Sequence, residues 1–320
     1  MPRSRLIRAV QVASAAVVSL LLAAVACVYL APGATTRFFI DAERWQAGLA
    51  RKEVDIGHGI HMVYLEGGQG EPLMLLHGFS DDKDNFVFVS RELVRHFHVV
   101  LPDINGFGES TRPADGHYGV DAQVDRLREM AKVLALGPLH LGGSSMGGQI
   151  AMIYAASHPA EVRSLWLLDA GGMATAPQSD MSRLETARKA APPADRKQAF
   201  DQEADMAMSD PPFIPKPMMD YIGAQRDQNK ATEAQVARDL KAEPGVEGRI
   251  KGLATPTLIV WGAQDHMINP ATAGLIHQLL PNSRVIMMPG AGHLPMLEQP
   301  EQSAADYLQF RATLSAGRPS

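Results

Sequence analysis

The longest apolar stretch of the chain lies at its N-terminus. It covers residues 9–30, contains no charged side chain and follows the basic residues Arg3, Arg5 and Arg8. A helix needs about 20 mainly apolar residues to cross a bilayer, and basic residues before it favour a cytoplasmic N-terminus. The pattern therefore predicts a membrane signal anchor over residues 1–36, with the rest of the chain exported to the periplasmic side.

Two other interpretations of this segment stay open. Ala24-Val25-Ala26 has the small-residue pattern of a signal-peptide cleavage site, so that cleavage would release a secreted or periplasmic protein. The same cleavage would leave Cys27 at the new N-terminus, which resembles a lipoprotein signal, although Ala24 stands where that signal prefers Leu. Residues 38–50 then predict an amphipathic helix that packs on the domain or lies on the membrane surface.

Beyond residue 50 the chain alternates short apolar runs with amphipathic stretches. Two segments around Gly57-His58-Gly59 indicate a β-hairpin, and six apolar runs that end in turn residues predict buried strands. The hairpin segments are 52–57 and 60–66, the strands 72–78, 97–103, 139–144, 162–169, 255–262 and 283–290, and the helices 83–95, 120–135, 146–157, 270–280 and 299–313. The alternation predicts an α/β fold with a mostly parallel central sheet and helices on both faces.

The alternation stops after Asp169 for about 80 residues, which is far longer than an ordinary connection. This stretch has no apolar run typical of a strand; it is polar, rich in methionine and helix-prone, and it includes PPFIPKP at 211–217. We expect an inserted helical cap over residues 172–252. The cap would divide the core into a first part at 37–171 and a second part at 253–320.

Composition excludes several classes of function. The chain has 30 Lys and Arg against 35 Asp and Glu, with no basic block beyond the N-terminus, so it lacks the electrostatic pattern of a nucleic-acid-binding protein. Its single cysteine, Cys27, excludes an intrachain disulfide framework, a multi-cysteine zinc site and an iron–sulfur cluster. The sequence has no H-E-x-x-H, G-x-G-x-x-G or P-loop, so we expect no metal and no other cofactor. It says nothing of protein partners.

The pentapeptide Gly143-Ser144-Ser145-Met146-Gly147 carries the main chemical signal. It fits the pattern G-x-S-x-G, and it lies between a predicted strand and a predicted helix. Such a sharp strand-to-helix turn exposes the serine hydroxyl at the carboxyl end of the sheet. We therefore expect Ser145 to be a nucleophile and the backbone N–H of Met146, at the helix N-terminus, to donate to a developing oxyanion.

A serine nucleophile needs a base, and the base needs a carboxylate that orients it. His293 follows the last predicted strand and Asp265 follows the strand before it, so both lie at the carboxyl edge of a parallel sheet, where open α/β folds bind ligands. We expect His293 as base and Asp265 as orienting acid. Asp169, at the end of another strand, stays open as an alternative acid, whereas Asp103 is interpreted as structural.

The remaining histidines are less well placed. His266 adjoins the proposed acid, and the others considered lie near the start of a strand or in the hairpin: His96, His98, His58 and His61. The second oxyanion donor is expected from the turn His77-Gly78-Phe79, as the backbone N–H of Phe79. Gly78 would allow the substrate to approach the backbone, and His77 is interpreted as structural.

Together these motifs resemble the α/β-hydrolase superfamily. HGF, GFGES, GGSSMGG, WGAQDHMI and GAGHLPMLEQP are similar to its lipase and esterase branch, over nearly all of residues 52–313. More narrowly, WQAGL, DKDNF, GGSSMGGQIA and SLWLLD resemble bacterial lipases of the Moraxella and Psychrobacter type and the membrane-anchored monoacylglycerol lipases of animals. The chain departs from these lipases at Ser144, where they commonly carry Asn.

The resemblance implies an α/β-hydrolase fold and a serine hydrolase that cleaves carboxylic esters through an acyl-enzyme. It assigns Ser145, His293 and Asp265 to a catalytic triad, and Phe79 and Met146 to the oxyanion hole. Serine at position 145 argues against haloalkane dehalogenases and epoxide hydrolases, which carry Asp there. The methionine-rich cap and PPFIPKP indicate an acyl pocket or a membrane-facing lid, and hence lipid esters such as monoacylglycerols or short-chain triacylglycerols as substrates. The alternative that these methionines are ordinary core residues stays open.

Two alternative functions stay open. A hydrolase of carbon–carbon bonds in products of aromatic ring cleavage would use the same triad, but such enzymes tend to carry HGxGPG where this chain has HGFSDDKD. A catalytically silent binding protein would keep the hydrolase fold without turnover. Failure to react with a fluorophosphonate probe would favour this second alternative.

Overall fold

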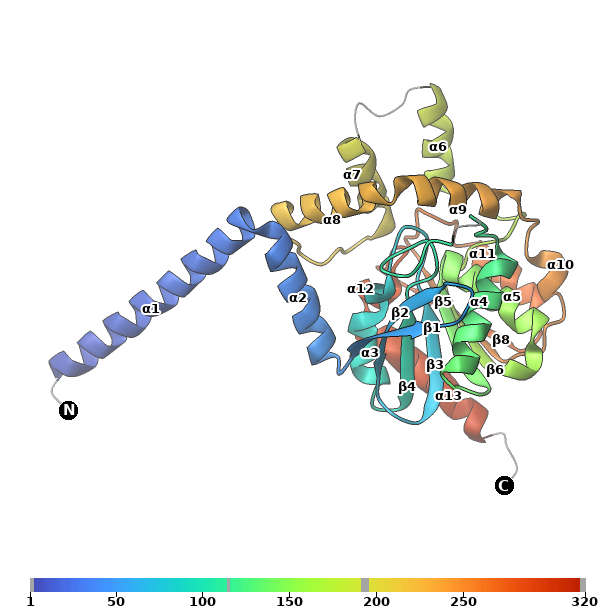
Figure 1. Ribbon diagram of the computed structural model, residues 1–320, viewed down its shortest axis with the longest axis horizontal. Coiled ribbons are helices and arrows are strands. Elements are labelled where there is room, and N and C mark those ends of the chain that lie inside the picture. The colour runs from blue at the N-terminus through green and yellow to red at the C-terminus, as the bar shows by residue number, and fades with distance from the viewer. Residues whose placement is uncertain (1–2, 114–115, 191–195, 317–320) are drawn as a thin grey trace. The chain divides into compact units, whose positions relative to one another are not determined.

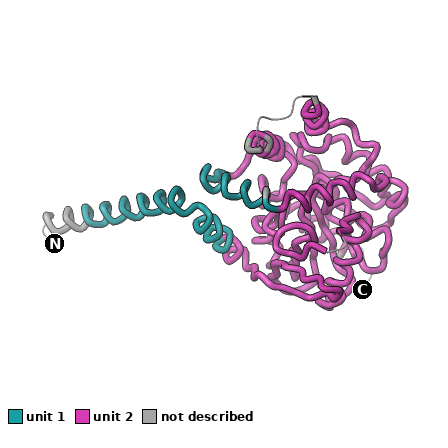
Figure 2. Tube along the Cα trace, turned by 45° about the horizontal axis from the view of Figure 1, so that its top comes forward, with its two compact units in different colours: residues 1–42, 213–228 teal, residues 43–212, 229–320 magenta. Residues whose placement is uncertain are grey.

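The computed structural model describes residues 3–113, 116–190 and 196–316. The chain forms two compact units, coloured separately in Figure 2. The smaller unit consists of Met1–Ala42 and Phe213–Gln228, and the larger unit of Glu43–Pro212 and Asn229–Ser320. The larger unit contains the sheet and every residue expected to take part in chemistry.

The smaller unit contains helix α1 (Arg3–Leu30), most of α2 (Pro32–Gln46) and α8 (Lys216–Gln228). Residues Val10–Leu30 of α1 are long and apolar enough to cross a membrane, with a mean hydropathy of 2.4. The helix predicted over 38–50 begins earlier, at Pro32, because proline fits the first turn of a helix. It ends at Gln46, shortly before Gly48 adopts a φ of +68°.

The larger unit is built on an eight-stranded sheet with the order β1-β2-β4-β3-β5-β6-β7-β8 (Figure 1). The strands are β1 (Ala50–Asp55), β2 (His61–Gly67), β3 (Glu71–Leu76), β4 (Phe97–Pro102), β5 (Leu139–Ser144), β6 (Val162–Leu168), β7 (Thr257–Gly262) and β8 (Ser283–Met288). The β1–β2 and β2–β4 pairs are antiparallel and the other pairs are parallel. The predicted hairpin and the mostly parallel sheet are therefore confirmed.

Helices cover both faces of this sheet, as Figure 1 shows. One hydrophobic core joins the sheet to α4 (Val120–Val133), α5 (Met146–Ser157), α10 (Glu247–Ile250) and α11 (Thr272–Leu279). The other joins it to η1 (Lys83–Phe86), α3 (Val87–Leu93), α12 (Pro295–Glu298) and α13 (Pro300–Ala316), and there the Trp166 and Tyr307 rings stack with centroids 4.4 Å apart. Because both faces of the sheet are buried, the sequences of the central strands are continuous apolar runs. The predicted α/β-hydrolase fold class is confirmed.

Between β6 and β7 the described residues form helices and no strand. The helices are α6 (Asp180–Ala190), α7 (Arg196–Ala207), α8, α9 (Lys230–Ala242) and α10, while the short η2 (Pro159–Glu161) precedes β6. Helix α8 belongs to the smaller unit and the other four to the larger one. The division of the chain into two core parts and a cap over 172–252 stays a prediction.

Candidate active site

Ser145 lies at the turn between β5 and α5. Its φ of 52° and ψ of −116° fall in a region that residues other than glycine rarely adopt. Two glycines make this turn possible: a Cβ on Gly143 would lie 2.3 Å from the backbone of Gly147, and a Cβ on Gly147 would lie 2.1 Å from the carbonyl oxygen of Leu76. The half-buried Ser145 is thus held at the carboxyl end of β5.

His293 and Asp265 form a buried hydrogen-bonded pair. The Nδ1 atom of His293 lies 2.9 Å from Oδ2 of Asp265, and their side chains are only 7% and 0% exposed. Oδ1 of Asp265 accepts hydrogen bonds from the backbone N–H groups of Met267 (2.8 Å) and Ile268 (3.0 Å). Because Asp265 accepts from Nδ1–H, Nε2 is the nitrogen of His293 that can act as a base.

The loop that carries His293 is fixed by groups that the sequence analysis does not identify. The backbone N–H of His293 donates to the carbonyl oxygen of Ala207 at 2.8 Å. The Glu298 carboxylate accepts from the backbone N–H of Gly292 at 2.9 Å and from that of Ser209 at 2.7 Å. The last residue of α7 and the short helix α12 therefore hold this loop. No local sequence motif indicates either contact.

The turn His77-Gly78-Phe79 adjoins Ser145. A Cβ on Gly78 would lie 3.4 Å from the Cβ of Ser145. Nε2 of the buried His77 accepts from the backbone N–H of Ile104 at 2.9 Å, so Nδ1 carries the proton and donates to the carbonyl oxygen of Gly78 at 2.7 Å. His77 thus ties the turn to the loop after β4. The turn places the Phe79 backbone in the vicinity of the Ser145 turn.

Ser145 and His293 are not joined by a hydrogen bond within the described residues. In hydrolases such a bond is often long in the free enzyme and tightens only when substrate binds. The structure therefore brings together the predicted base with the predicted acid, and the predicted nucleophile with the predicted oxyanion turn. The complete triad remains part of the proposal below.

The alternative acid, Asp169, lies beside this pair without taking its place. It is fully buried at the end of β6, and its Oδ1 accepts from the backbone N–H of Gly262 at 2.9 Å. One side-chain atom each of Asp169, Asp265 and His293 lie within 4.8 Å of one another. These atoms have the chemistry of metal ligands, but His293 is already engaged by Asp265, which favours Asp265 as the orienting acid.

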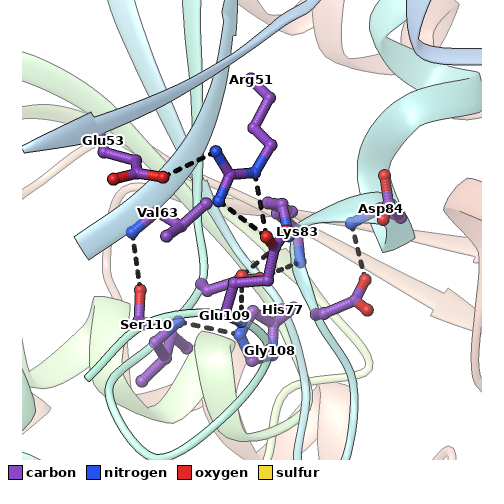
Figure 3. A network of polar contacts seen from close by, with 12 residues as sticks. Arg51, Glu53, Val63, His77, Lys83, Asp84, Gly108, Glu109 and Ser110 are labelled. Carbon is purple, nitrogen blue, oxygen red and sulfur yellow. Dashed lines mark hydrogen bonds and ion pairs between the residues drawn. The ribbon is translucent and has the colours of Figure 1, made fainter. Parts of the chain in front are cut away.

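A network of charged groups includes Lys83, which follows the predicted oxyanion turn closely in sequence (Figure 3). Nζ of Lys83 lies 2.8 Å from Asp103 and 2.8 Å from Glu109, and Arg51 lies 2.7 Å from Glu109. The Lys83 and Asp103 side chains are 1% and 0% exposed. Partial burial opposes ionisation of Glu109, but hydrogen bonds from Arg51 and Lys83 hold its pKa at about 2. Asp103 is thus structural, as interpreted from the sequence, whereas the burial of Lys83 has no local signal.

Replacing Lys83 is expected to destabilise the fold strongly. Lys83→Met should lower the free energy of unfolding by about 3–5 kcal/mol, because it leaves the buried Asp103 carboxylate without its ion partner. Urea unfolding of the detergent-solubilised protein, followed by tryptophan fluorescence, measures this change. The control is Lys132→Met, which removes a half-exposed ion pair with Glu129 and should change stability by less than about 1 kcal/mol. Equal losses would contradict this account.

Two cavities are lined by residues from elements next to the Ser145 turn, although Ser145 and His293 are not among their described lining residues. The larger has a volume of about 540 Å³ and the smaller one of about 310 Å³, and they share Gly172 and Met173. Phe79 lines the larger cavity together with side chains of α9, including Ala237 and Leu240. The smaller one is lined by Gly171, whose backbone N–H donates to the Ser145 carbonyl oxygen at 2.9 Å. The larger cavity therefore adjoins the predicted oxyanion turn at Phe79, and the smaller one adjoins the residue that hydrogen bonds to the backbone of Ser145.

Comparisons with known proteins identify the family of the chain. The α/β hydrolase fold family matches residues 71–300. Lipase 1 of Psychrobacter immobilis is 39% identical over 294 residues, covering 89% of this chain and 91% of its own. Human monoacylglycerol lipase ABHD6 is 25% identical, covering 92% and 91%. The crystal structure of a bacterial membrane phospholipase A superposes with a TM-score of 0.84 at 32% identity, covering 95% of this chain and 99% of that one. The chain therefore belongs to the α/β-hydrolase family.

Proposed function

We propose that this protein hydrolyses lipid esters through an acyl-enzyme on Ser145, with His293 as base and Asp265 as orienting acid. The observation that carries the proposal is the buried 2.9 Å hydrogen bond between His293 and Asp265, at the edge of the sheet where β5 presents the strained Ser145 turn. The chain is an ester-hydrolysing enzyme of the lipase and esterase class, as its 39% identity to two named bacterial lipases supports.

The residues would act in two half-reactions. Ser145 Oγ attacks the ester carbonyl carbon while Nε2 of His293 takes the hydroxyl proton, and Asp265 stabilises the imidazolium that forms. The backbone N–H groups of Met146 and Phe79 donate to the oxyanion. His293 then protonates the leaving alcohol and afterwards activates the water that releases the fatty acid from Ser145.

The larger cavity supports a substrate with an acyl chain. Its volume of about 540 Å³ is within the range of small-molecule pockets. Phe79, Met173 and Leu240 supply apolar surface, while Lys241 and Glu243 supply polar groups at the same cavity. We infer that the acyl chain occupies this cavity and that the substrates include monoacylglycerols, the class acted on by the named animal relatives.

Ala237→Trp tests this assignment, because Ala237 lines the larger cavity at an exposed position of α9. With p-nitrophenyl esters of graded length, the substitution should lower kcat/KM for long-chain esters about tenfold, the effect of losing the contacts of about one buried methylene group. Acetate ester hydrolysis should stay unchanged. Arg238→Trp places the same indole at the next, exposed position, which does not line the cavity, and should leave both activities unchanged.

Two other outcomes of this assay would contradict the acyl-chain assignment or the proposed function. Equal losses on short and long esters after Ala237→Trp would contradict an acyl chain in the larger cavity. No hydrolysis of any ester by the unsubstituted protein would contradict the proposed function itself. That result would favour the carbon–carbon bond hydrolase or the silent binding protein.

We also infer that α1 anchors the protein in a membrane with the larger unit on the periplasmic side. The apolar residues Val10–Leu30 support a spanning helix. The basic residues that precede them, Arg3, Arg5 and Arg8, support a cytoplasmic N-terminus. Protease added to spheroplasts should digest the larger unit, and protection of this unit would contradict the topology. The N-terminal mass of the mature chain decides between an intact anchor and cleavage before Cys27.

A further inference from the structure

Asp169 is a buried carboxyl group that the proposed mechanism does not use. Asp169 directly follows β6, and its side chain is inaccessible to solvent. Its backbone φ is 46°. Oδ1 accepts from the backbone N–H of Gly262 at 2.9 Å. Within the described residues Oδ2 is buried and has no hydrogen-bond partner. An unpaired buried carboxylate oxygen is costly, so this atom requires an explanation.

The neighbouring Asp265 carboxylate has room for one more donor. A carboxylate offers about four acceptor sites, two on each oxygen. Met267 and Ile268 use both sites on Oδ1, and His293 uses one on Oδ2. The remaining site is on Oδ2, and the Asp169 carboxyl group lies in the same cluster, within 4.8 Å. Two carboxylates cannot hydrogen bond to each other, but a protonated one can donate to the other.

We propose that Asp169 is a positioning residue whose Oδ2 carries a proton and donates a hydrogen bond to Oδ2 of Asp265. The proton satisfies the unpaired oxygen of Asp169 and fills the last acceptor site of Asp265. Asp265 is thereby held against His293 by Asp169 on one side and by two backbone N–H groups on the other. This role rests on the proposed function, because it acts through the Asp265–His293 pair.

The electrostatic surroundings of Asp169 agree with a neutral carboxyl group. Complete burial raises its pKa well above the ordinary value, and the charge of the neighbouring Asp265 raises it further. Glu298 of α12 adds to this effect, and the backbone N–H of Gly262 opposes it. His293 is the remaining titratable member of the cluster.

A titrating Asp169 has consequences for pH dependence. As the pH rises through its raised pKa, Asp169 loses its proton and repels Asp265, so the pair with His293 is disturbed and activity falls on the alkaline side. The free energy of unfolding also decreases as the pH rises. The folded protein keeps a proton that the unfolded chain loses near the ordinary carboxyl pKa, so the stability contribution of Asp169 declines as pH rises between these two pKa values.

The test compares Asp169→Asn with Asp169→Leu in the full-length protein. Asparagine still accepts from Gly262 and donates toward Asp265, but it does not titrate. Asp169→Asn should therefore keep neutral-pH kcat within about threefold of the unsubstituted protein and lack its alkaline decline. Asp169→Leu cannot donate, so it should lower kcat about tenfold with KM unchanged, the effect of one hydrogen bond to a charged group.

Infrared spectroscopy supplies a readout that needs no substrate. The unsubstituted protein should show the carbonyl band of a protonated carboxyl group at neutral pH, and Asp169→Asn should lack it. A difference spectrum is required because desolvation also raises the pKa of two other carboxyl groups, Asp82 and Asp84. The absence of any band that Asp169→Asn removes would overturn the proposal.

The two readouts separate this proposal from the proposed function. If the band is present but the unsubstituted protein hydrolyses no ester, the proposed function fails while the proton remains assigned to Asp169. An alkaline decline that is identical in Asp169→Asn overturns the role of Asp169 in pH dependence. If Asp169→Leu folds and keeps the full kcat, the positioning role is overturned; if it does not fold, the comparison with Asp169→Asn still decides.

Discussion

Ser145→Ala is expected to lower the kcat of ester hydrolysis by about 10⁴-fold or more, as in other serine hydrolases that lose their nucleophile. The proposed acyl-enzyme has no other attachment point, and the remaining activity would come from the oxyanion donors and substrate binding. The fold should be kept, because alanine has the same Cβ as serine at the strained turn and the Ser145 side chain makes no cap hydrogen bond to α5.

The matched control is Ser144→Ala. Ser144 is the preceding residue, it is fully buried, and its Oγ has no hydrogen-bond partner in the described part of the chain. Removing this hydroxyl should leave kcat within about threefold, because no hydrogen bond is broken. If Ser145→Ala kept most of the activity, or if Ser144→Ala lost as much, Ser145 would not be the nucleophile.

Asp265→Asn is expected to lower kcat by about 10⁴-fold, because it changes the tautomer of His293. The backbone N–H groups of Met267 and Ile268 donate to Oδ1, so the asparagine oxygen must take that position. Its amino group then faces His293 and donates to Nδ1. The imidazole proton moves to Nε2, which can no longer accept the proton of Ser145.

The control for this substitution is Asp180→Asn. Asp180 also hydrogen bonds to a histidine, with Oδ2 lying 2.5 Å from Nδ1 of His266, but both side chains are exposed. The same chemical change should therefore leave kcat unchanged. A fall in kcat for Asp180→Asn, or full activity of Asp265→Asn, would contradict the assignment of the acid.

Much of the sheet could be predicted from the sequence because its signals are local. Strands buried on both faces are continuous apolar runs, and β5, β6 and β7 have this pattern. The prediction of a buried strand over 283–290 is wrong in one respect: β8 forms, but it lies at the edge of the sheet and is mostly half-buried or exposed. The turn at Ser145 was predictable for the same reason, since strand, small residues and helix are consecutive. Asp265 and His293 could be placed because each follows its strand directly and parallel strands end at one edge.

The remaining features depend on contacts between distant segments. Lys83 lies in a polar run that indicates exposure, and it is buried because Asp103 and Glu109 lie beside it in space. Asp169 could be recognised as a strand-terminal acid, but not as a neighbour of Asp265, because their proximity depends on the pairing of β6 with β7. The grouping of α8 with the N-terminal helices likewise has no sequence signal.

Peptide mapping by mass spectrometry after reaction with a fluorophosphonate probe identifies the nucleophilic serine directly. The probe reacts with activated serine hydroxyls, so we expect one stoichiometric adduct on Ser145. This adduct should be lost when the protein is denatured before labelling, and it should form far more slowly in Asp265→Asn. An adduct at another residue, or no adduct on a protein that hydrolyses esters, would show that Ser145 is not the nucleophile.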